Sequence, residues 1–189
     1  MMIAVCTAIL ERFLAPWPLA VHVYNQYYQG LVNRELRLTK ISSADRVLCI
    51  GGGPVPGTAL EIVAQTGANV DVLDCDPTAV RLARRVVSRH KCKGKVQIFR
   101  ANGCDFDLSQ YTLVHIARQA QPQSEILNHA WRNLPRGARI ILRPPRRDLH
   151  DLYTCLTNRC WHINCILRNH NCLATHSSIL LSKPLDADA

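Results

Sequence analysis

The chain has 189 residues, 48% of them hydrophobic and 20% charged, so it can bury one sizeable core and is not globally disordered. Its 23 Lys and Arg residues outnumber its 14 Asp and Glu residues, and the formal net charge of +9 permits an anionic partner without bearing on the fold. No run of eighteen apolar residues occurs, which argues against a membrane-spanning helix and a membrane partner.

The chain begins with an apolar stretch. Residues 1–10 lack a basic leader and are followed at once by Glu11, so they predict a helix that packs or associates rather than a secretory signal. Association through these N-terminal helices would make a homo-oligomer. After a proline-rich break, residues 21–38 are expected to form a second helix, in which Tyr28 and Glu35 share one face.

Short apolar runs alternate with helical segments in the rest of the chain. Arg46–Ile50 is typical of a buried parallel strand, and Asp76 is placed to cap a helix that has Pro77 at its first position. The expected strands are residues 46–50, 69–73, 96–99, 113–117, 138–142, 161–167 and 177–181. One helix is expected to start at residue 58, and three others to span residues 77–89, 125–133 and 149–158. The alternation predicts an α/β fold with a doubly wound, mostly parallel, Rossmann-like sheet and an antiparallel pair at one edge.

The expected organisation has three parts. A helical extension precedes one α/β domain and a short tail, at residues 1–40, 41–184 and 185–189.

Nine cysteines are present, an odd number without paired spacing. Together with the lack of an export signal, they indicate reduced thiols in a cytoplasmic protein. Cys160, His162 and Cys165 belong to a C-terminal group of cysteines and histidines that suggests zinc. No C-x-x-C pair occurs, however, and thiol packing in an edge strand is the preferred interpretation, without a metal.

A glycine-rich turn follows the first expected strand. Gly51, Gly52 and Gly53 allow a ligand to approach the backbone closely, and the helix that starts near Thr58 presents free N–H groups. Asp74 ends the next strand, where a carboxylate can accept hydrogen bonds from both hydroxyls of an adenosine ribose. Asn102, after the third strand, is a candidate to recognise the adenine edge.

The sequence favours an adenosine ligand that carries no phosphates. The dinucleotide pattern G-x-G-x-x-G would need glycine where Pro56 stands, and no Lys-Ser or Lys-Thr pair follows the loop. S-adenosylmethionine (SAM) is the leading candidate. In the alternative interpretation the glycines only form a tight turn and Asp74 only caps a helix.

At this point the residues 49–59, CIGGGPVPGTA, resemble the nicotianamine synthase family, whose loop has the signature G-[SG]-G-P-x-P-x-[TS]. The segment Y-x-x-L-x-x-x-E at Tyr28–Glu35 and the acidic strand end at 73–77 are similar to the family as well, and Arg143 matches a recurrent arginine. The resemblance implies a SAM-binding, methyltransferase-like fold. The candidate SAM-binding residues are Gly51, Gly52, Gly53, Pro54, Thr58, Asp74, Cys75, Asn102 and Ala117.

The resemblance also implies a reaction. Family members transfer the 3-amino-3-carboxypropyl group of SAM to an amine, so a small-molecule amine is the expected acceptor. Tyr28 would line the site with Glu35 nearby. The family has a catalytic glutamate before the tyrosine helix, and Glu11 is the single acid among the 27 residues before Tyr28. Glu11 is thus a candidate for this role, although a surface helix charge is the favoured interpretation.

Two other functions stay open. The first alternative is an ordinary SAM-dependent methyltransferase acting on a small molecule or RNA. The second is a SAM-binding protein without catalysis. Seven cations between Arg81 and Lys95 would hold RNA phosphates, but no aromatic residues interleave with them, and a solvated face is the favoured interpretation. His115, inside a strand, is expected to be a core histidine or one that supports the site from behind.

Overall fold

A computed structural model describes residues 18–92, 94–144, 163–168 and 177–185. Within these residues, no helix combines the length and the apolar character that crossing a membrane requires. The expected helices at residues 1–10 and 149–158, and with them Glu11, lie outside the described residues.

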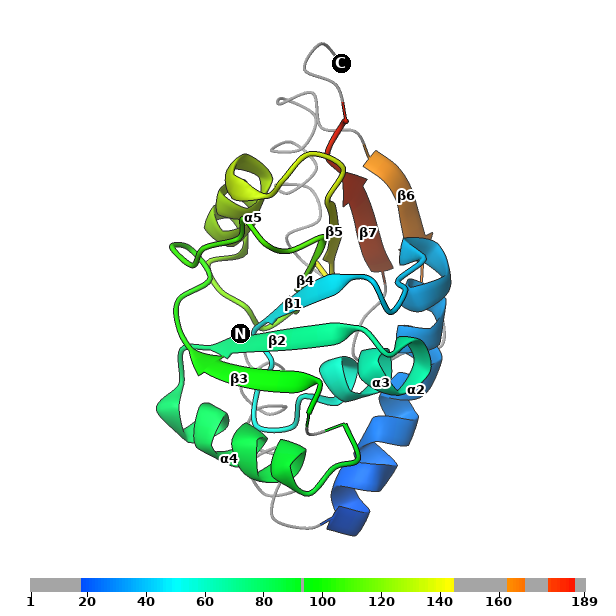
Figure 1. The fold of residues 1–189 in the computed structure, drawn as a ribbon, viewed down its shortest axis with the longest axis vertical. Helices are drawn as coiled ribbons and strands as arrows, with labels where there is room; N and C mark the ends of the chain where they lie inside the picture. Colours follow the sequence, from blue (N-terminus) through cyan, green and yellow to red (C-terminus); the bar gives the residue numbers. More distant parts are fainter. Residues whose placement is uncertain (1–17, 93, 145–162, 169–176, 186–189) are drawn as a thin grey trace.

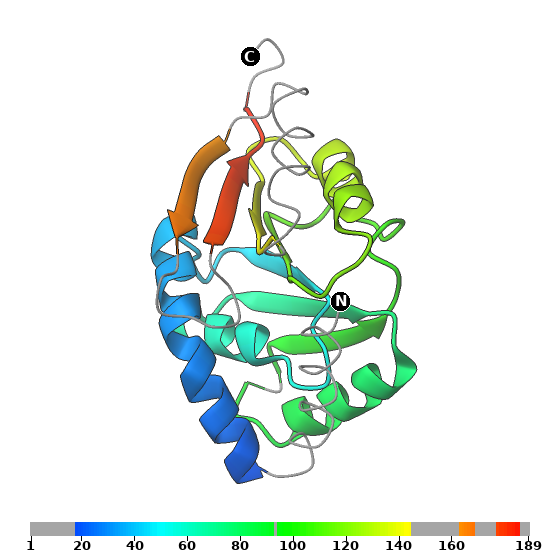
Figure 2. The same cartoon turned by 180° about the vertical axis from the view of Figure 1, so that it is seen from behind.

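A seven-stranded sheet organises the molecule (Figure 1). The strands are β1 (Arg46–Ile50), β2 (Asn69–Asp74), β3 (Val96–Arg100), β4 (Leu113–Ile116), β5 (Arg139–Leu142), β6 (Ile163–Arg168) and β7 (Ser177–Ser182). Their order is β3-β2-β1-β4-β5-β7-β6, with the first five parallel. β7 runs antiparallel to β5 and to β6, which lies outermost (Figure 2), so the predicted antiparallel edge pair is confirmed.

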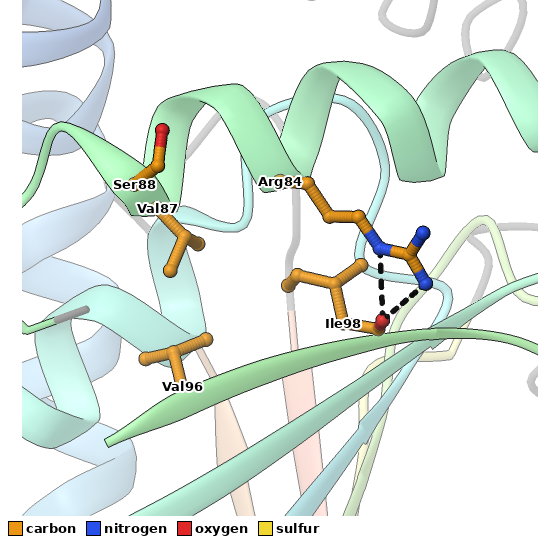
Figure 3. A pocket seen from close by; sticks show the side chains of 5 residues that line it. All are labelled: Arg84, Val87, Ser88, Val96 and Ile98. Carbon is orange, nitrogen blue, oxygen red and sulfur yellow. Dashed lines mark hydrogen bonds between the residues drawn. The ribbon is translucent and has the colours of Figure 1, made fainter. Parts of the chain in front are cut away.

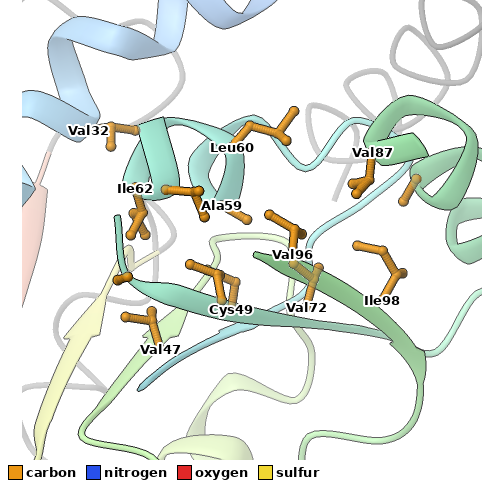
Figure 4. Close-up of a cluster of buried hydrophobic side chains, with 14 of the residues drawn as sticks. Val32, Val47, Cys49, Ala59, Leu60, Ile62, Val72, Val87, Val96 and Ile98 are labelled. Atoms are coloured by element: carbon orange, nitrogen blue, oxygen red, sulfur yellow. The ribbon is translucent and has the colours of Figure 1, made fainter. Parts of the chain in front are cut away.

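Helices cover both faces of the sheet. They are α2 (Pro18–Thr39), α3 (Gly57–Thr66), α4 (Pro77–Ser88) and α5 (Gln123–Asn133). Residues of α2, α3 and α4 share one buried cluster (Figure 4), and residues of α5 belong to a second. The doubly wound α/β architecture predicted from the alternation is therefore confirmed.

The strand β1 shows why its sequence folds this way. Four of its five residues are buried, which is typical of a parallel strand covered on both sides. Because side chains alternate along a strand, Val47 and Cys49 join the cluster under α3, whereas Leu48 and Ile50 join the one under α5. Burial raises the pKa of the Cys49 thiol to about 12, so this cysteine behaves as a small apolar residue.

The helix α4 begins as its sequence predicts. Asp76 is the N-cap and its side chain accepts a hydrogen bond of 2.8 Å from the Thr78 amide, while Pro77 occupies the first turn. The helix α5 begins at Gln123, two residues earlier than expected. The Gln123 side chain turns into the core, where it donates to the carbonyl oxygens of Ala117 and Arg143. The helix was therefore expected to start too late because Gln123 is a polar residue whose side chain is buried.

Candidate functional site

The strand order reverses between β1 and β4, and the glycine-rich loop lies there. β2 and β3 extend the sheet to one side of β1, and β4 and β5 extend it to the other. In open α/β sheets, ligands bind beyond the carboxyl ends of the strands at such a switch point.

The glycines of the loop are required by its geometry. Gly51 and Gly53 have φ of 79° and 65°, a region that favours glycine. The amides of Gly51 and Gly52 donate to the Leu73 carbonyl at 2.9 and 3.1 Å. A Cβ on Gly52 would lie 2.1 Å from Val72 Cγ1, and one on Gly51 would lie 2.9 Å from Ala120 Cβ. The loop is thus packed between Val72 of β2 and Ala120 after β4, so a side chain at Gly51 or Gly52 does not fit.

Asp74 braces this loop from the neighbouring strand. Its Oδ2 accepts a hydrogen bond of 2.8 Å from the Gly53 amide, and its Oδ1 accepts one of 2.9 Å from the Asp76 amide. Asp76, rather than Asp74, caps α4. Asp74 remains half-buried, and a carboxylate oxygen that accepts one hydrogen bond can accept another. The carboxylate is therefore fixed in position with acceptor capacity on its solvent side.

The double-proline segment leads into α3. Residues 53–57 are buried, and Pro56 occupies the N-cap position without a side-chain hydrogen bond. Thr58 lies in the first turn, and its Oγ1 accepts a hydrogen bond of 3.1 Å from Arg143 Nη1. The N-terminus of α3 follows the glycine-rich loop directly, as the sequence predicts.

The other predicted SAM-binding residues lie at neighbouring strand ends. Cys75 is an exposed free thiol next to Asp74. Asn102 is exposed after β3, and its Oδ1 accepts from the Cys104 amide at 3.1 Å. Ala117 is buried just after β4, with its amide donating to the Ile50 carbonyl at 3.0 Å. Their contact with SAM stays a prediction.

A buried ion pair lies beside the start of α3. Arg143, after β5, donates from Nε to Glu35 Oε1 at 2.8 Å and from Nη2 to Glu35 Oε2 at 2.6 Å. Glu35, in α2, is 4% exposed and also accepts a 2.6 Å hydrogen bond from the Ser178 hydroxyl of β7. The third guanidinium nitrogen of Arg143 is the one that holds Thr58. We call Glu35, Arg143, Ser178, His115 and Thr58 the buried network.

The electrostatics of the buried network favour an ionised Glu35. Burial alone disfavours the charged carboxylate, but the Arg143 guanidinium more than offsets it and holds the pKa of Glu35 well below its usual range. His115, in β4, is buried with its Nε2 3.7 Å from Glu35 Oε2, and it makes no Nε2 hydrogen bond among the described residues. Burial and the nearby Arg143 lower its pKa, so His115 is neutral at pH 7.

Tyr28 lies in α2 seven residues before Glu35, but its side chain is outside what the structure describes, as is Glu11. The structure therefore places Glu35 near the start of α3, which follows the glycine-rich loop. The catalytic roles of Tyr28, Glu35 and Glu11 stay predictions.

Sequence reasoning missed two members of this region. Ser178 reads as an ordinary residue of an edge strand, yet it is fully buried against Glu35. Gln123 follows a proline and was expected to lie outside the helix. For Ser178 the one signal is its place beside the apolar run 179–181, and the residues around Gln123 give no such signal.

Comparisons with known proteins agree with this geometry. The sequence model of the family described as nicotianamine synthase protein matches residues 5–171. A curated relative from Yersinia pestis, named L-histidine 2-aminobutanoyltransferase, is 28% identical over 142 residues, which are 75% of this chain and 52% of the relative. The chain thus spans about half the length of that relative.

Solved structures share the fold. A mutant of MtNAS in complex with S-adenosylmethionine has a TM-score of 0.69 at 20% identity, over 84% of this chain and 62% of that one. A protein from Methanococcus maripaludis, described as a putative S-adenosyl-L-methionine-dependent methyltransferase, has a TM-score of 0.74 at 10% identity, over 96% and 94%. At these identities the likeness establishes the methyltransferase-like fold alone.

Proposed function

The chain belongs to the nicotianamine synthase family, and from this premise we propose that it is a SAM-dependent transferase. It moves the 3-amino-3-carboxypropyl group of SAM to a small-molecule amine. The observation that carries the proposal is the glycine-rich loop, which has no room for side chains and is braced by Asp74 at the switch point of the sheet.

Two proteins similar to this chain support this assignment. The Yersinia pestis relative is named for the transfer of an aminobutanoyl group to L-histidine, which is an amine acceptor. The MtNAS mutant was solved with S-adenosylmethionine. Both proteins match most of this chain, over 75% and 84% of its residues.

The residues of the loop suit the adenosine part of SAM. Asp74 accepts hydrogen bonds from the ribose hydroxyls while its other lone pairs hold Gly53 and Asp76. The backbone of Gly51–Gly53 allows close approach, and Asn102, Cys75 and Ala117 surround the adenine. Pro56 stands where the dinucleotide pattern needs glycine, and no Lys-Ser or Lys-Thr pair follows the loop to hold a pyrophosphate.

The sulfonium of SAM activates all three attached carbons, and the product depends on which carbon lies in line with the amine. In the proposed reaction the amine nitrogen forms a bond to the terminal carbon of the aminocarboxypropyl chain while the bond from that carbon to sulfur breaks. Methylthioadenosine leaves with the electron pair, and the amine gives up a proton to a base.

We assign Glu35 a positioning role in this reaction. Its two oxygens accept hydrogen bonds from Arg143 and Ser178, and its pKa is held low, so it is a poor acceptor for the proton of the amine. It fixes α2, which carries Tyr28, against the first turn of α3. Tyr28 and Glu11 remain the candidates for the proton.

Product analysis tests the proposal. The purified chain is incubated with SAM and a panel of amines that includes L-histidine, and the nucleoside products are separated and identified by mass spectrometry. Methylthioadenosine together with an aminocarboxypropylated amine is the expected result. S-adenosylhomocysteine would instead show methyl transfer, and calorimetric binding of SAM without turnover would show a non-catalytic SAM-binding protein.

A further inference from the structure

The net positive charge of the chain is concentrated in one segment. Residues 77–104 contain no Asp or Glu, and eight of the 23 Lys and Arg residues fall between Arg81 and Arg100. The rest of the chain is nearly neutral, with 15 Lys and Arg residues against 14 Asp and Glu residues. A solvated protein surface normally mixes positive and negative residues, so a segment of 28 residues whose charges are all positive needs a separate explanation.

The basic residues of this segment lie on neighbouring elements of the structure. The segment forms α4, the following turn and β3, which is the edge strand of the sheet. The apolar residues of α4 are buried against the sheet, so its basic residues face outward. Seven described cations are exposed, and they make up what we call the basic face: Arg81, Arg84, Arg85, Arg89, Lys91, Lys95 and Arg100.

Among the residues that the structure describes, no ion pair neutralises the basic face. In the part of the chain that the structure describes, the ion pairs involve Arg46, Arg139, Arg143 and His115, none of which belongs to it. Burial and the charge of Glu61 in α3 raise the pKa of Cys92, which lies in the turn after α4. Glu61 Oε1 accepts hydrogen bonds from the side-chain amides of Gln29 and Gln65 and from no cation.

A hollow of about 420 Å³ lies between α4 and β3 within the basic face (Figure 3). Val87 of α4 and Val96 and Ile98 of β3 form its apolar lining, and Arg84 crosses it to donate from Nε and Nη2 to the Ile98 carbonyl at 3.2 and 2.9 Å. This contact occupies an outward acceptor of the edge strand, so Arg84 protects β3 against pairing with an extended peptide. It also holds one guanidinium in a fixed orientation at the surface.

We propose that the basic face docks the phosphate backbone of a double-stranded nucleic acid. Five of its seven cations are arginines, whose planar guanidinium groups match phosphate oxygens in pairs. Arg81, Arg85 and Arg89 follow one another four residues apart, about 6 Å per step at 1.5 Å rise per residue. The helix backbone therefore holds these three arginines at regular spacing, which a flexible loop would not do.

Other polyanions fit this surface less well. Single strands are held by aromatic side chains that stack on bases, and Phe99, the one aromatic residue between Pro77 and Arg100, is half-buried and packs at 6.1 Å against Phe106. An amphipathic helix binds a membrane surface by inserting its apolar side chains, and the apolar residues of α4 are instead buried in the core. Contacts to phosphates alone carry no base information, so the binding is independent of sequence.

A charge-reversal variant tests the proposal. We expect the unmodified chain to bind a short RNA duplex, measured by fluorescence anisotropy, with an affinity that falls at least tenfold between about 50 and 200 mM salt. Reversing Arg81, Arg85 and Arg89 to Glu should weaken binding at least tenfold and lower the slope of log affinity against log salt by about 3. A DNA duplex of unrelated sequence should behave similarly.

The matched control reverses three exposed arginines elsewhere, with the same change in net charge: Arg37→Glu, Arg132→Glu and Arg136→Glu. It should stay within about threefold of the unmodified chain in duplex affinity. Equal losses in both triple variants would overturn the proposal, because binding would then follow overall charge. Retention on phosphatidylserine vesicles without duplex binding would overturn it as well, as would no duplex binding at about 50 mM salt. Circular dichroism and SAM calorimetry confirm that both variants remain folded.

Discussion

Asp74 shows how a single carboxylate joins structure and proposed function. It braces the loop through Gly53 and Asp76, and in the proposed complex it accepts the ribose hydroxyls as well. Its neighbour Asp76 uses its side chain to cap α4. Two aspartates separated by one residue therefore have distinct tasks that mutation can separate.

The first prediction compares these two residues. Asp74→Ala should weaken SAM binding by ~1.5–3 kcal/mol, because a charge-assisted acceptor and a brace of the loop are lost together. Asp76→Ala should instead lower the free energy of unfolding by about 1 kcal/mol and leave SAM affinity nearly unchanged. Calorimetry and urea unfolding measure the two effects. Unchanged SAM affinity in Asp74→Ala would remove this residue from the proposed site.

His115 makes stability depend on pH. Its pKa is lowered in the folded chain, first by burial and then by Arg143, whereas the unfolded chain binds a proton below about pH 6.5. A group with a depressed folded pKa contributes stability above its unfolded pKa and loses it as the pH falls. We expect the free energy of unfolding to decrease below about pH 6.5, by up to ~1.4 kcal/mol per pH unit for this one group.

The measurement is urea unfolding between about pH 7 and pH 5, where histidine changes its charge. His115→Gln, which cannot titrate, should flatten the decrease relative to the unmodified chain. An identical pH profile in both proteins would show that another group causes the dependence.

At the scale of elements, the glycine-rich loop depends on the space beside β2. Gly52→Ala should destabilise the chain by about 1–3 kcal/mol and abolish measurable SAM binding, because the new methyl group meets Val72 at 2.1 Å. Gly30→Ala is the matched control. Nothing lies within 4 Å of a Cβ at Gly30 in α2, so the same substitution should stabilise the chain by about 0.5–1 kcal/mol. Thermal unfolding and SAM calorimetry of both variants check the pair, and full SAM binding in Gly52→Ala would contradict this account of the loop.

The elements themselves were largely predictable from sequence, for reasons that particular residues show. Buried parallel strands such as β1 are continuous apolar runs, and Asp76-Pro77 combines a cap with a first-turn proline, so their bounds agree with the structure. Within the site, the glycines and Asp74 have local signatures. The partners of Glu35 do not, because Ser178 lies 143 residues away and meets it only through the order of the strands.

At the scale of the whole molecule, the buried network is the point where separate layers meet. Through Arg143 and Glu35 it joins α2, α3, β4 and β7 to the end of β5. Buried ion pairs are often no more stabilising than well-packed apolar residues, although breaking one by removing a single partner is costly. The network is therefore better explained by the position it gives α2 and Thr58 beside the glycine-rich loop than by stability.

The last prediction separates these two explanations. Arg143→Met alone should destabilise the chain by about 3–5 kcal/mol, since it leaves the Glu35 carboxylate buried without its cation. Replacing Glu35 by Leu, Arg143 by Met and Ser178 by Ala together should recover most of that loss, because no buried charge is then unpaired. If the network positions the proposed site, transferase turnover in this apolar variant should stay low while its thermal stability returns. Recovery of turnover along with stability, measured on the same preparations, would show that the ion pair serves the fold alone.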